Sequence, residues 1–394
     1  MAIWRLEEMI VGIPREIMPG EDRVSASPET VKLMTQQGWT VLVEEGAGEG
    51  SFYHDPQYIE AGAQMIKNCE DLYNKADVIL KVKEPLMNEA KGKHEIDMMH
   101  EGQYIITFIH PAAPANHDMV KKMAKAGIVS LTLDGVPRIS RAQNLDALTS
   151  MSTCAGYKGI LMAANYLPRF MPQMFTAVGM VKPINTLVIG TGVGGLQAVA
   201  TAKRLGSVLY AADIRPDAAE QAMSLGAKVI DLGIPKEAAI GEGGYAQKLS
   251  EDLLKKEREV LKDHVKDMDI IFCSALVPGE LAPVLITEEM VKSMKPGSVI
   301  VDISIDQGGN CEITPPGTVE VKHHVTLVGI KNIPGHLPTS STWMFSQNIY
   351  NFLKYITQDG QIVLDRNDEI IAKTLVTIDG QLVHHGARLA MGLD

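Results

Sequence analysis

The chain has 394 residues, with 37 lysines and arginines against 48 aspartates and glutamates, and its formal net charge is −11. The length suffices for two domains, and the acidic balance argues against a nucleic acid or an anionic membrane surface as a direct partner. The four cysteines form no CxxC pair and no metal-like cluster, so we interpret them as reduced thiols and expect no metal. No apolar run approaches the roughly 18 residues of a membrane helix, and the N-terminus lacks a signal-peptide pattern, so we expect a cytoplasmic chain without direct membrane insertion.

The first 148 residues alternate short apolar runs with helical segments. Strand-like runs are MIVGI, TVLVEEGAG, DVILKVK, QYIITFI and IVSLTL, and a helix is expected over 27–37. Glycines 46, 48 and 50 follow the second run, but no convincing helix or ribose-binding acid comes after them. We interpret them as a turn, which predicts a sheet of Rossmann-like type without a nucleotide.

The clearest motif follows an apolar strand at 187–189. Gly190-x-Gly192-x-x-Gly195 leads into a helix over 196–205, and the next strand, 208–212, ends at Asp213. In such a unit the glycines permit a tight turn and close backbone approach, the helix N-terminus holds a diphosphate, and the acid binds the adenosine ribose. The acid repels a 2′-phosphate, which favours NAD over NADP, although a neighbouring arginine weakens that preference. The predicted cofactor contacts are Gly190, Thr191, Gly192, Val193, Gly194, Gly195, Asp213, Ile214 and Arg215.

The β/α rhythm continues beyond this motif. Strand-like runs at 227–231, 269–275, 298–304 and 325–330 predict a doubly wound parallel sheet. Residues 242–246 have the composition of a mobile lid and equally of an ordinary exposed loop. The mixed charges of the helix from about residue 247 are expected to form a solvated face, and the tail is expected to be an amphipathic helix over 341–356.

Several stretches resemble the alanine dehydrogenase/pyridine nucleotide transhydrogenase family. VPRISRAQNLDALTSMSTCAGYKG is similar to the Arg–Gln–Asp loop of the soluble NAD(H)-binding component of proton-translocating transhydrogenases, and GGYA at 243–246 is similar to its mobile loop. The stretches SALVPGELAPVLITEEMVKSMKPGSVIVDI and IPGHLPTSSTWMFSQNIYNFLK also match. This resemblance adds Arg138, Gln143, Asp146 and Tyr245 as catalytic residues and Gly244, Ala275 and Leu276 as cofactor contacts.

The resemblance also implies an architecture and partners. The fold class is α/β, with two Rossmann-like doubly wound domains: 1–148 completed by 338–394, and an NAD(H)-binding domain over 149–337. The chain is expected to form a homodimer and to pass hydride from NADH to NADP+ held by a partner subunit. No second nucleotide fingerprint and no membrane span are recognised in the sequence. NADP(H) binding and proton translocation are therefore expected from partner subunits, which would hold this chain at the inner membrane.

A second set of residues matches the alanine dehydrogenase branch instead. These enzymes use cations to hold a substrate carboxylate and a group that titrates near neutral pH to move protons. The matching positions are Arg23 in PGEDRVSASP, Lys83 in LKVKEP, His110 in TFIHPAAP and Asp306 in VDISIDQGGN. The alternative prediction is therefore an NAD-dependent amino-acid dehydrogenase that reductively aminates a small 2-oxo acid.

Overall fold

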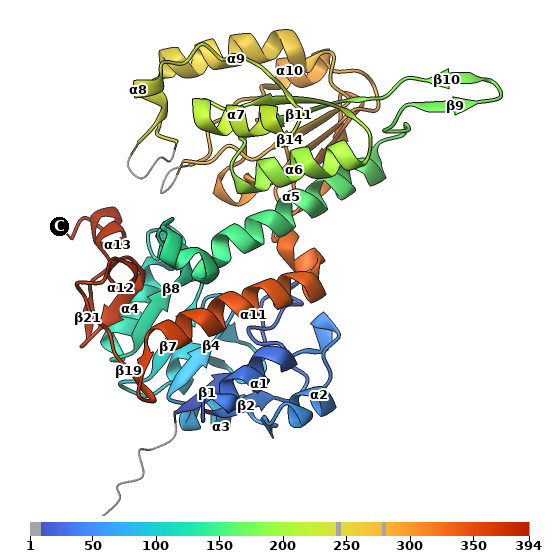
Figure 1. Cartoon of the computed structure of the whole chain (residues 1–394). Coiled ribbons are helices and arrows are strands. Elements are labelled where there is room, and N and C mark those ends of the chain that lie inside the picture. The colour runs from blue at the N-terminus through green and yellow to red at the C-terminus, as the bar shows by residue number, and fades with distance from the viewer. Residues whose placement is uncertain (1–8, 242–245, 278–280, 394) are drawn as a thin grey trace, which may run out of the picture. The chain divides into compact units, whose positions relative to one another are not determined.

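Figure 1 shows a computed structural model, which describes residues 9–241, 246–277 and 281–393. The chain divides into two compact units, Met1–Met151 with Gly335–Asp394 (unit 1) and Ser152–Pro334 (unit 2). Each unit is built around a largely parallel sheet flanked by helices, which confirms the α/β fold class. Within the described ranges, no helix is both long and apolar enough to cross a membrane.

Unit 1 contains an eight-stranded sheet in the order β21-β20-β8-β7-β4-β1-β2-β3, counted over the described residues. Its central strands are short aliphatic runs buried on both faces, as expected for parallel strands covered by helices. The strands are β1 (Ile10–Ile13), β2 (Thr40–Glu44), β3 (Gln64–Ile66), β4 (Val78–Leu80), β7 (Tyr104–Thr107), β8 (Val129–Thr132), β20 (Leu375–Ile378) and β21 (Gln381–Leu382). The helices are α1 (Pro28–Gln36), α2 (Asp55–Glu60), α3 (Cys69–Lys75), α4 (His117–Lys125), α11 (Pro338–Tyr355), α12 (Glu369–Thr374) and α13 (His385–Ala390).

The C-terminal segment contributes more to unit 1 than the helix expected from the sequence. Besides α11, it supplies β20, which pairs antiparallel with β8. The hydroxyls of Ser130 and Thr377 lie 2.6 Å apart between these strands, and both residues are fully buried. The helix expected over 341–356 is present as α11, and the tail adds strands that the sequence did not predict, because long-range pairing with β8 extends the sheet.

Unit 2 contains a seven-stranded sheet in the order β13-β12-β11-β14-β15-β17-β16, again over the described residues. All its pairings are parallel except that of β16 with β17. The strands are β11 (Asn185–Ile189), β12 (Val208–Ala212), β13 (Lys228–Val229), β14 (Ile270–Cys273), β15 (Val299–Asp302), β16 (Val319–Lys322) and β17 (Val325–Val328). The helices are α5 (Ala147–Tyr166, which enters unit 2 at residue 152), α6 (Val193–Arg204), α7 (Pro216–Ser224), α8 (Lys236–Ala239), α9 (Glu251–Val265) and α10 (Glu288–Ser293).

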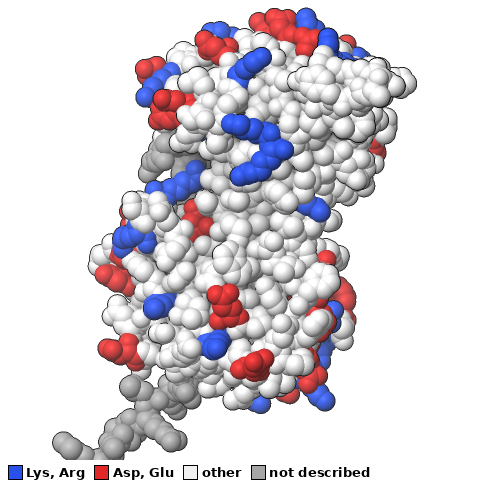
Figure 2. Space-filling view, turned by 45° about the vertical axis from the view of Figure 1, so that its right-hand side comes forward, with Lys and Arg blue, Asp and Glu red and all other residues white. Residues whose placement is uncertain are grey.

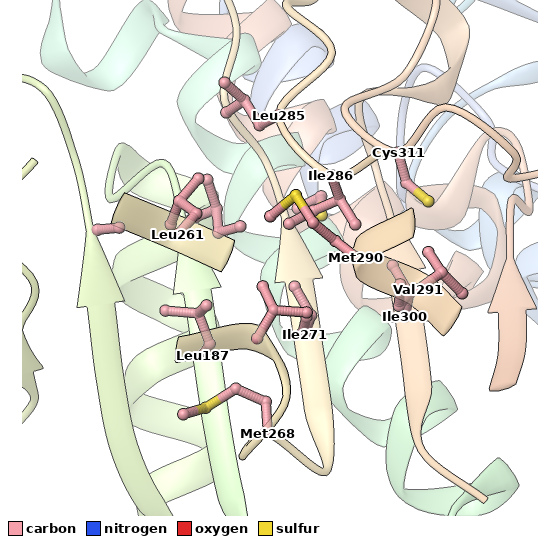
Figure 3. Packing of buried hydrophobic residues seen from close by; sticks show 14 of the residues in the cluster. Leu187, Leu261, Met268, Ile271, Leu285, Ile286, Met290, Val291, Ile300 and Cys311 are labelled. Atoms are coloured by element: carbon pink, nitrogen blue, oxygen red, sulfur yellow. The ribbon is translucent and has the colours of Figure 1, made fainter. Parts of the chain in front are cut away.

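Successive residues of the strands of unit 2 pack alternately into two separate apolar clusters, one on each face of the sheet. Leu187 and Ile189 of β11 pack in one cluster with residues of α9 and α10, whereas Val188 packs in the other with residues of α5 and α6. This is the period-two alternation of a strand covered on both faces. Figure 3 shows the first cluster, with Leu261 of α9 on the same side of the sheet as Leu187.

A β-hairpin extends from the sheet of unit 2 between α5 and β11. Its strands are β9 (Met174–Thr176) and β10 (Gly179–Val181), which pair antiparallel. The hairpin exposes large apolar side chains: Phe175 is 78% exposed and Val178 is 99% exposed. The apolar pattern of the sequence did not predict it.

Figure 2 shows how the charged side chains are distributed on one face of the molecule. In unit 2 several Lys and Arg side chains lie together in the middle of this face and the acidic side chains lie toward its margins, with wide uncharged areas between the charged groups.

Candidate functional site

The turn between β11 and α6 has the geometry of a dinucleotide-binding loop. Gly190 has a φ of +82°, and a Cβ there would lie 2.6 Å from the backbone nitrogen of Ala275. A Cβ on Gly195 would collide with the Gly190 carbonyl oxygen. Only glycine therefore fits at these two positions.

Gly192 is the N-cap of α6, and no side chain of the described residues caps this helix end. A Cβ on Gly192 would meet only the guanidinium of Arg215, at 3.9 Å. The N-terminus of a helix offers free N–H groups and a positive dipole end. Open space over such an end suits a diphosphate.

Asp213 follows β12 and faces the glycine turn. Its Oδ2 accepts hydrogen bonds from the backbone nitrogen of Thr191 at 2.7 Å and from Nη2 of Arg215 at 2.9 Å. Its Oδ1 accepts from the backbone nitrogen and Nε of Arg215, at 2.8 and 3.0 Å. The structure thus brings together the glycine turn, the acid and the arginine that the sequence placed in one motif.

A cavity of about 360 Å³ opens next to Asp213. Apolar side chains form most of its wall, and the acid stands at its edge. This combination of an apolar slot and a carboxylate suits a flat base attached to a ribose. The lining residues are Asp213, Ile214, Pro216, Ala219, Glu220, Met223, Val229, Ile230, Asp231, Leu232, Gly233 and Ile234.

The loop after β14 is fixed against the glycine turn. The Ser274 hydroxyl donates to the Gly190 carbonyl oxygen at 2.7 Å. Asn310 is fully buried and holds Ala275 on both sides, because its Oδ1 accepts from the Ala275 nitrogen at 2.9 Å and its Nδ2 donates to the Ala275 oxygen at 2.8 Å. Leu276, the other predicted contact of this loop, is 37% exposed.

Asp302, at the end of β15, supports this arrangement, and sequence reasoning missed it. Its carboxylate accepts from the backbone nitrogens of Asn310 and Cys311, at 2.7 and 2.9 Å, and of Ser304 at 3.0 Å. Burial raises the pKa of Asp302 to about 6, against the lowering effect of these three donors. The stretch VDISIDQGGN drew attention to Asp306, but Asp302 and Asn310 are the residues that shape the loop.

Arg138, Gln143 and Asp146 lie around the short 3-10 helix Ser140–Leu145 of unit 1. Arg138 and Gln143 are exposed, whereas Asp146 is buried. The Asp146 carboxylate accepts from the backbone nitrogen and the hydroxyl of Thr149, at 2.9 and 2.6 Å, as a residue that caps the start of α5 does. Gly244 and Tyr245 lie outside the described residues.

The alternative dehydrogenase residues are divided between the units. Arg23 is 3% exposed and forms an ion pair with Glu21, at 2.5 Å between Nη2 and Oε2. Lys83 lies in the turn after β4, also in unit 1. Asp306 belongs to unit 2, and its carboxylate lies 4.0 Å from Nζ of Lys331. Unit 1 therefore carries three of the four residues of this set.

His110, the third of these residues, is held in an unusual backbone conformation after β7. Its φ is +49°, and its Nδ1 lies 2.8 Å from Oδ1 of Asp134. Oδ2 of Asp134 accepts from the backbone nitrogen of His110 at 2.7 Å. Burial opposes the charged imidazole, but the Asp134 carboxylate outweighs it and raises the pKa of His110 above its usual value. A positive φ at a non-glycine residue is a strained feature that concentrates at functional sites.

A buried ionic cluster, which sequence reasoning also missed, holds the turn that carries Lys83. Nζ of the fully buried Lys81 lies 2.8 Å from Oε1 of Glu95 and 3.4 Å from Oε2 of Glu16. Glu16 accepts from the backbone nitrogen of Val82 at 2.6 Å, and Glu95 accepts from that of Leu86 at 2.8 Å. Burial raises the pKa of Glu16 to about 7, against the lowering effect of Lys81.

Family models match both halves of the chain. The N-terminal domain model of alanine dehydrogenase/PNT (pyridine nucleotide transhydrogenase) matches residues 12–155, and the C-terminal domain model matches residues 159–385. The chain belongs to the alanine dehydrogenase/PNT family. Its fold and the glycine turn of unit 2 are therefore those of a family of oxidoreductases.

Individual members of the alanine dehydrogenase/PNT family resemble the chain over almost its full length. An NAD(P) transhydrogenase alpha-subunit chain of Rhodospirillum rubrum is 43% identical, and the match covers 95% of this chain and 98% of the relative. An alanine dehydrogenase of Staphylococcus saprophyticus is 30% identical, with coverage of 98% and 97%. The solved transhydrogenase of Sinorhizobium meliloti has a TM-score of 0.83 at 37% identity, with coverage of 95% of this chain and 100% of its own. Identity is thus higher to the two transhydrogenase chains than to this dehydrogenase.

Proposed function

We propose that this chain is the NAD(H)-binding subunit of a transhydrogenase and passes hydride between NADH and NADP+ held by a partner subunit. The observation that carries the proposal is the site in unit 2, where the glycine turn, Asp213 and the apolar cavity meet. The diphosphate would lie over the N-terminus of α6, the ribose at Asp213 and the adenine in the cavity. The relative named as an alpha subunit of NAD(P) transhydrogenase supports the presence of further subunits, and we assign the second nucleotide to one of them.

The reaction needs orientation and no protein acid or base. NADH gives up a hydride from C4 of its nicotinamide and becomes NAD+, and C4 of NADP+ accepts it to give NADPH, so atoms and electrons balance. The protein contributes by holding the two rings in contact and excluding water. We assign this role to the exposed side chains of Arg138 and Gln143, to Asp146, and to Tyr245 with Gly244 as the closing loop.

Transfer of deuterium from [4-²H]NADH to NADP+, followed by NMR, tests this proposal. The purified chain should give no transfer alone and sustained transfer after addition of an NADP(H)-binding domain from a transhydrogenase. Gln143→Ala should slow the transfer by about tenfold or more if this amide orients the ring. Asn144→Ala, which alters the adjacent exposed residue, should leave the rate unchanged. Absence of transfer with the partner domain present would contradict the proposal.

The proposed complex has two further components. One partner subunit would span the membrane and couple hydride transfer to proton translocation, and it would hold this chain at the membrane surface. The other is a second copy of the chain, because the hairpin β9–β10 exposes Phe175, Val178 and Met180 to solvent, as a surface that becomes buried in a dimer does. Light scattering should give a dimer for the wild type and a monomer for Phe175→Ser/Val178→Ser.

A second candidate function is an amino-acid dehydrogenase, and the His110–Asp134 pair favours it. An imidazole fixed by a carboxylate can exchange protons with an imine or amine, and Lys83 lies close enough to His110 to affect its pKa. NADH oxidation with pyruvate and ammonia, by the chain alone, tests this function. Turnover that falls by about 10²–10⁴ in His110→Gln, with NADH binding intact, would establish it.

A further inference from the structure

A carboxyl group lies inside the apolar face of α9, close to the proposed ribose site. Leu254, Glu257, Leu261 and Val265 are the buried residues of this helix, and their spacing places them on one face. Glu257 is 4% exposed. Its position corrects the expectation that the charges of this helix all face solvent.

Glu257 and Asp213 are flanked by residues of the same apolar cluster, and the charge of Asp213 acts on Glu257. Leu254 and Leu261, which flank Glu257 along α9, pack in one cluster with Ala212, and Ile214 packs against that cluster. Ala212 and Ile214 are the neighbours of Asp213 in the chain. Figure 3 shows this cluster, with Leu261 lying over the strands of the sheet.

No described residue donates a hydrogen bond to Glu257, and its carboxyl oxygens are not among the fully enclosed side-chain atoms that lack a partner, so they keep some contact with solvent. A buried carboxyl group without a donor is stable in its protonated form. Burial and the ionised Asp213 raise the pKa of Glu257 to about 7, while Arg258 lowers it. The proton on this group is therefore sensitive to charge changes at Asp213.

The side chain of Arg215 is the cation that pairs with the Asp213 carboxylate. Nε and Nη2 of Arg215 donate to both oxygens of Asp213, at 3.0 and 2.9 Å, while Thr191 occupies Oδ2 with its backbone nitrogen at 2.7 Å. Ribose hydroxyls that donate to Asp213 need these same lone pairs. Because the backbone donors are fixed, the guanidinium is the group that must move away.

Departure of the guanidinium changes the electrostatics around Glu257. Asp213 then lacks its side-chain cation, and the diphosphate of the nucleotide adds negative charge over α6. Both changes disfavour the ionised form of Glu257 and favour its protonated form. Among the described residues, the cation that acts on Glu257 is Arg258, whose Nε donates to the Val284 oxygen at 2.7 Å; this bond holds its side chain in place.

We propose that Glu257 takes up a proton when the adenosine ribose of NAD(H) replaces Arg215 at Asp213, so that nucleotide affinity falls as the pH rises. This inference rests on the proposed NAD(H) binding and adds a proton-linked residue to that site. A proton linked to binding weakens affinity by at most about tenfold per pH unit above the midpoint of its titration.

Calorimetry with NAD+ between about pH 6 and about pH 8, in two buffers of different protonation enthalpy, tests the proposal. The wild type should take up a fraction of a proton on binding, and its Kd should rise with pH. Glu257→Gln should bind with a Kd independent of pH and without proton uptake. Glu259→Gln, which removes an exposed carboxylate of the same helix, should behave as the wild type.

The outcomes separate this inference from the proposed function. NAD+ binding with a pH-independent Kd and no proton uptake in the wild type would overturn the inference and leave the binding site standing. Unchanged proton uptake in Glu257→Gln would also overturn it. Lack of NAD+ binding at every pH would overturn the proposed function together with the inference. The wild-type measurement needs no variant, so it remains decisive even if Glu257→Gln fails to fold.

Discussion

Replacement of Asp213 by asparagine should change which nucleotide the chain binds. The ionised carboxylate can accept charge-assisted hydrogen bonds from the ribose hydroxyls, which contribute about 1.5–3 kcal/mol. Part of this energy is offset, because the ion pair between Asp213 and Arg215 must first be broken. The side chain of Arg215 is 16% exposed and that of Asp213 is 4% exposed. We therefore expect a net contribution at the low end of the range, about 1.5 kcal/mol. A free-energy difference of about 1.4 kcal/mol corresponds to a tenfold difference in affinity.

We therefore expect the wild type to bind NADH at least about tenfold more tightly than NADPH. Asp213→Asn should weaken NADH binding by about tenfold and strengthen NADPH binding, because the released Arg215 can then pair with the 2′-phosphate. Fluorescence titration of both reduced nucleotides measures the two constants. Asp217→Asn, which removes an exposed carboxylate in the first turn of α7, is the matched control. Equal affinities in the wild type, or an unchanged ratio in Asp213→Asn, would refute this reasoning.

Three other results are expected. Lys81→Met should lower the free energy of unfolding by about 3–5 kcal/mol in urea titrations, because Glu16 and Glu95 lose their buried cation. Lys75→Met, at an exposed position, should change the free energy of unfolding by less than about 0.5 kcal/mol. A small effect of Lys81→Met would show that the buried cluster relaxes. The folded-state pKa of His110 is raised, so its ion pair stabilises the fold below the usual histidine pKa and this stability is lost as the pH rises through the folded value. The stability difference between wild type and His110→Gln should accordingly be larger near pH 6 than near pH 8, and a reversed trend would contradict the pairing. Proteolysis near Tyr245 should slow on addition of NADH, and unchanged cleavage at saturation would remove the loop from the proposed site.

The sequence by itself determined the fold class and the local shape of the turn after β11. Aliphatic runs of four or five residues separated by helices specify strands buried on both faces. A tight strand-to-helix turn leaves no room for a Cβ at Gly190 or Gly195, so its requirements are visible in a short stretch of sequence. These properties depend on neighbours along the chain, which is why periodicity and glycine spacing indicate them.

The tertiary structure decided what depends on residues far apart in sequence. The pairing of β20 with β8 joins positions more than 240 residues apart. The Asp379-Gly380 turn indicates the hairpin β20–β21 locally, but no pattern in the tail identifies β8 as its partner. Lys81 and Glu257 are of residue types that usually lie on the surface, and only the elements packed around them bury them. Their burial, and with it the raised pKa of Glu257 beside Asp213, arises from packing between distant segments, because desolvation is a property of the assembled core.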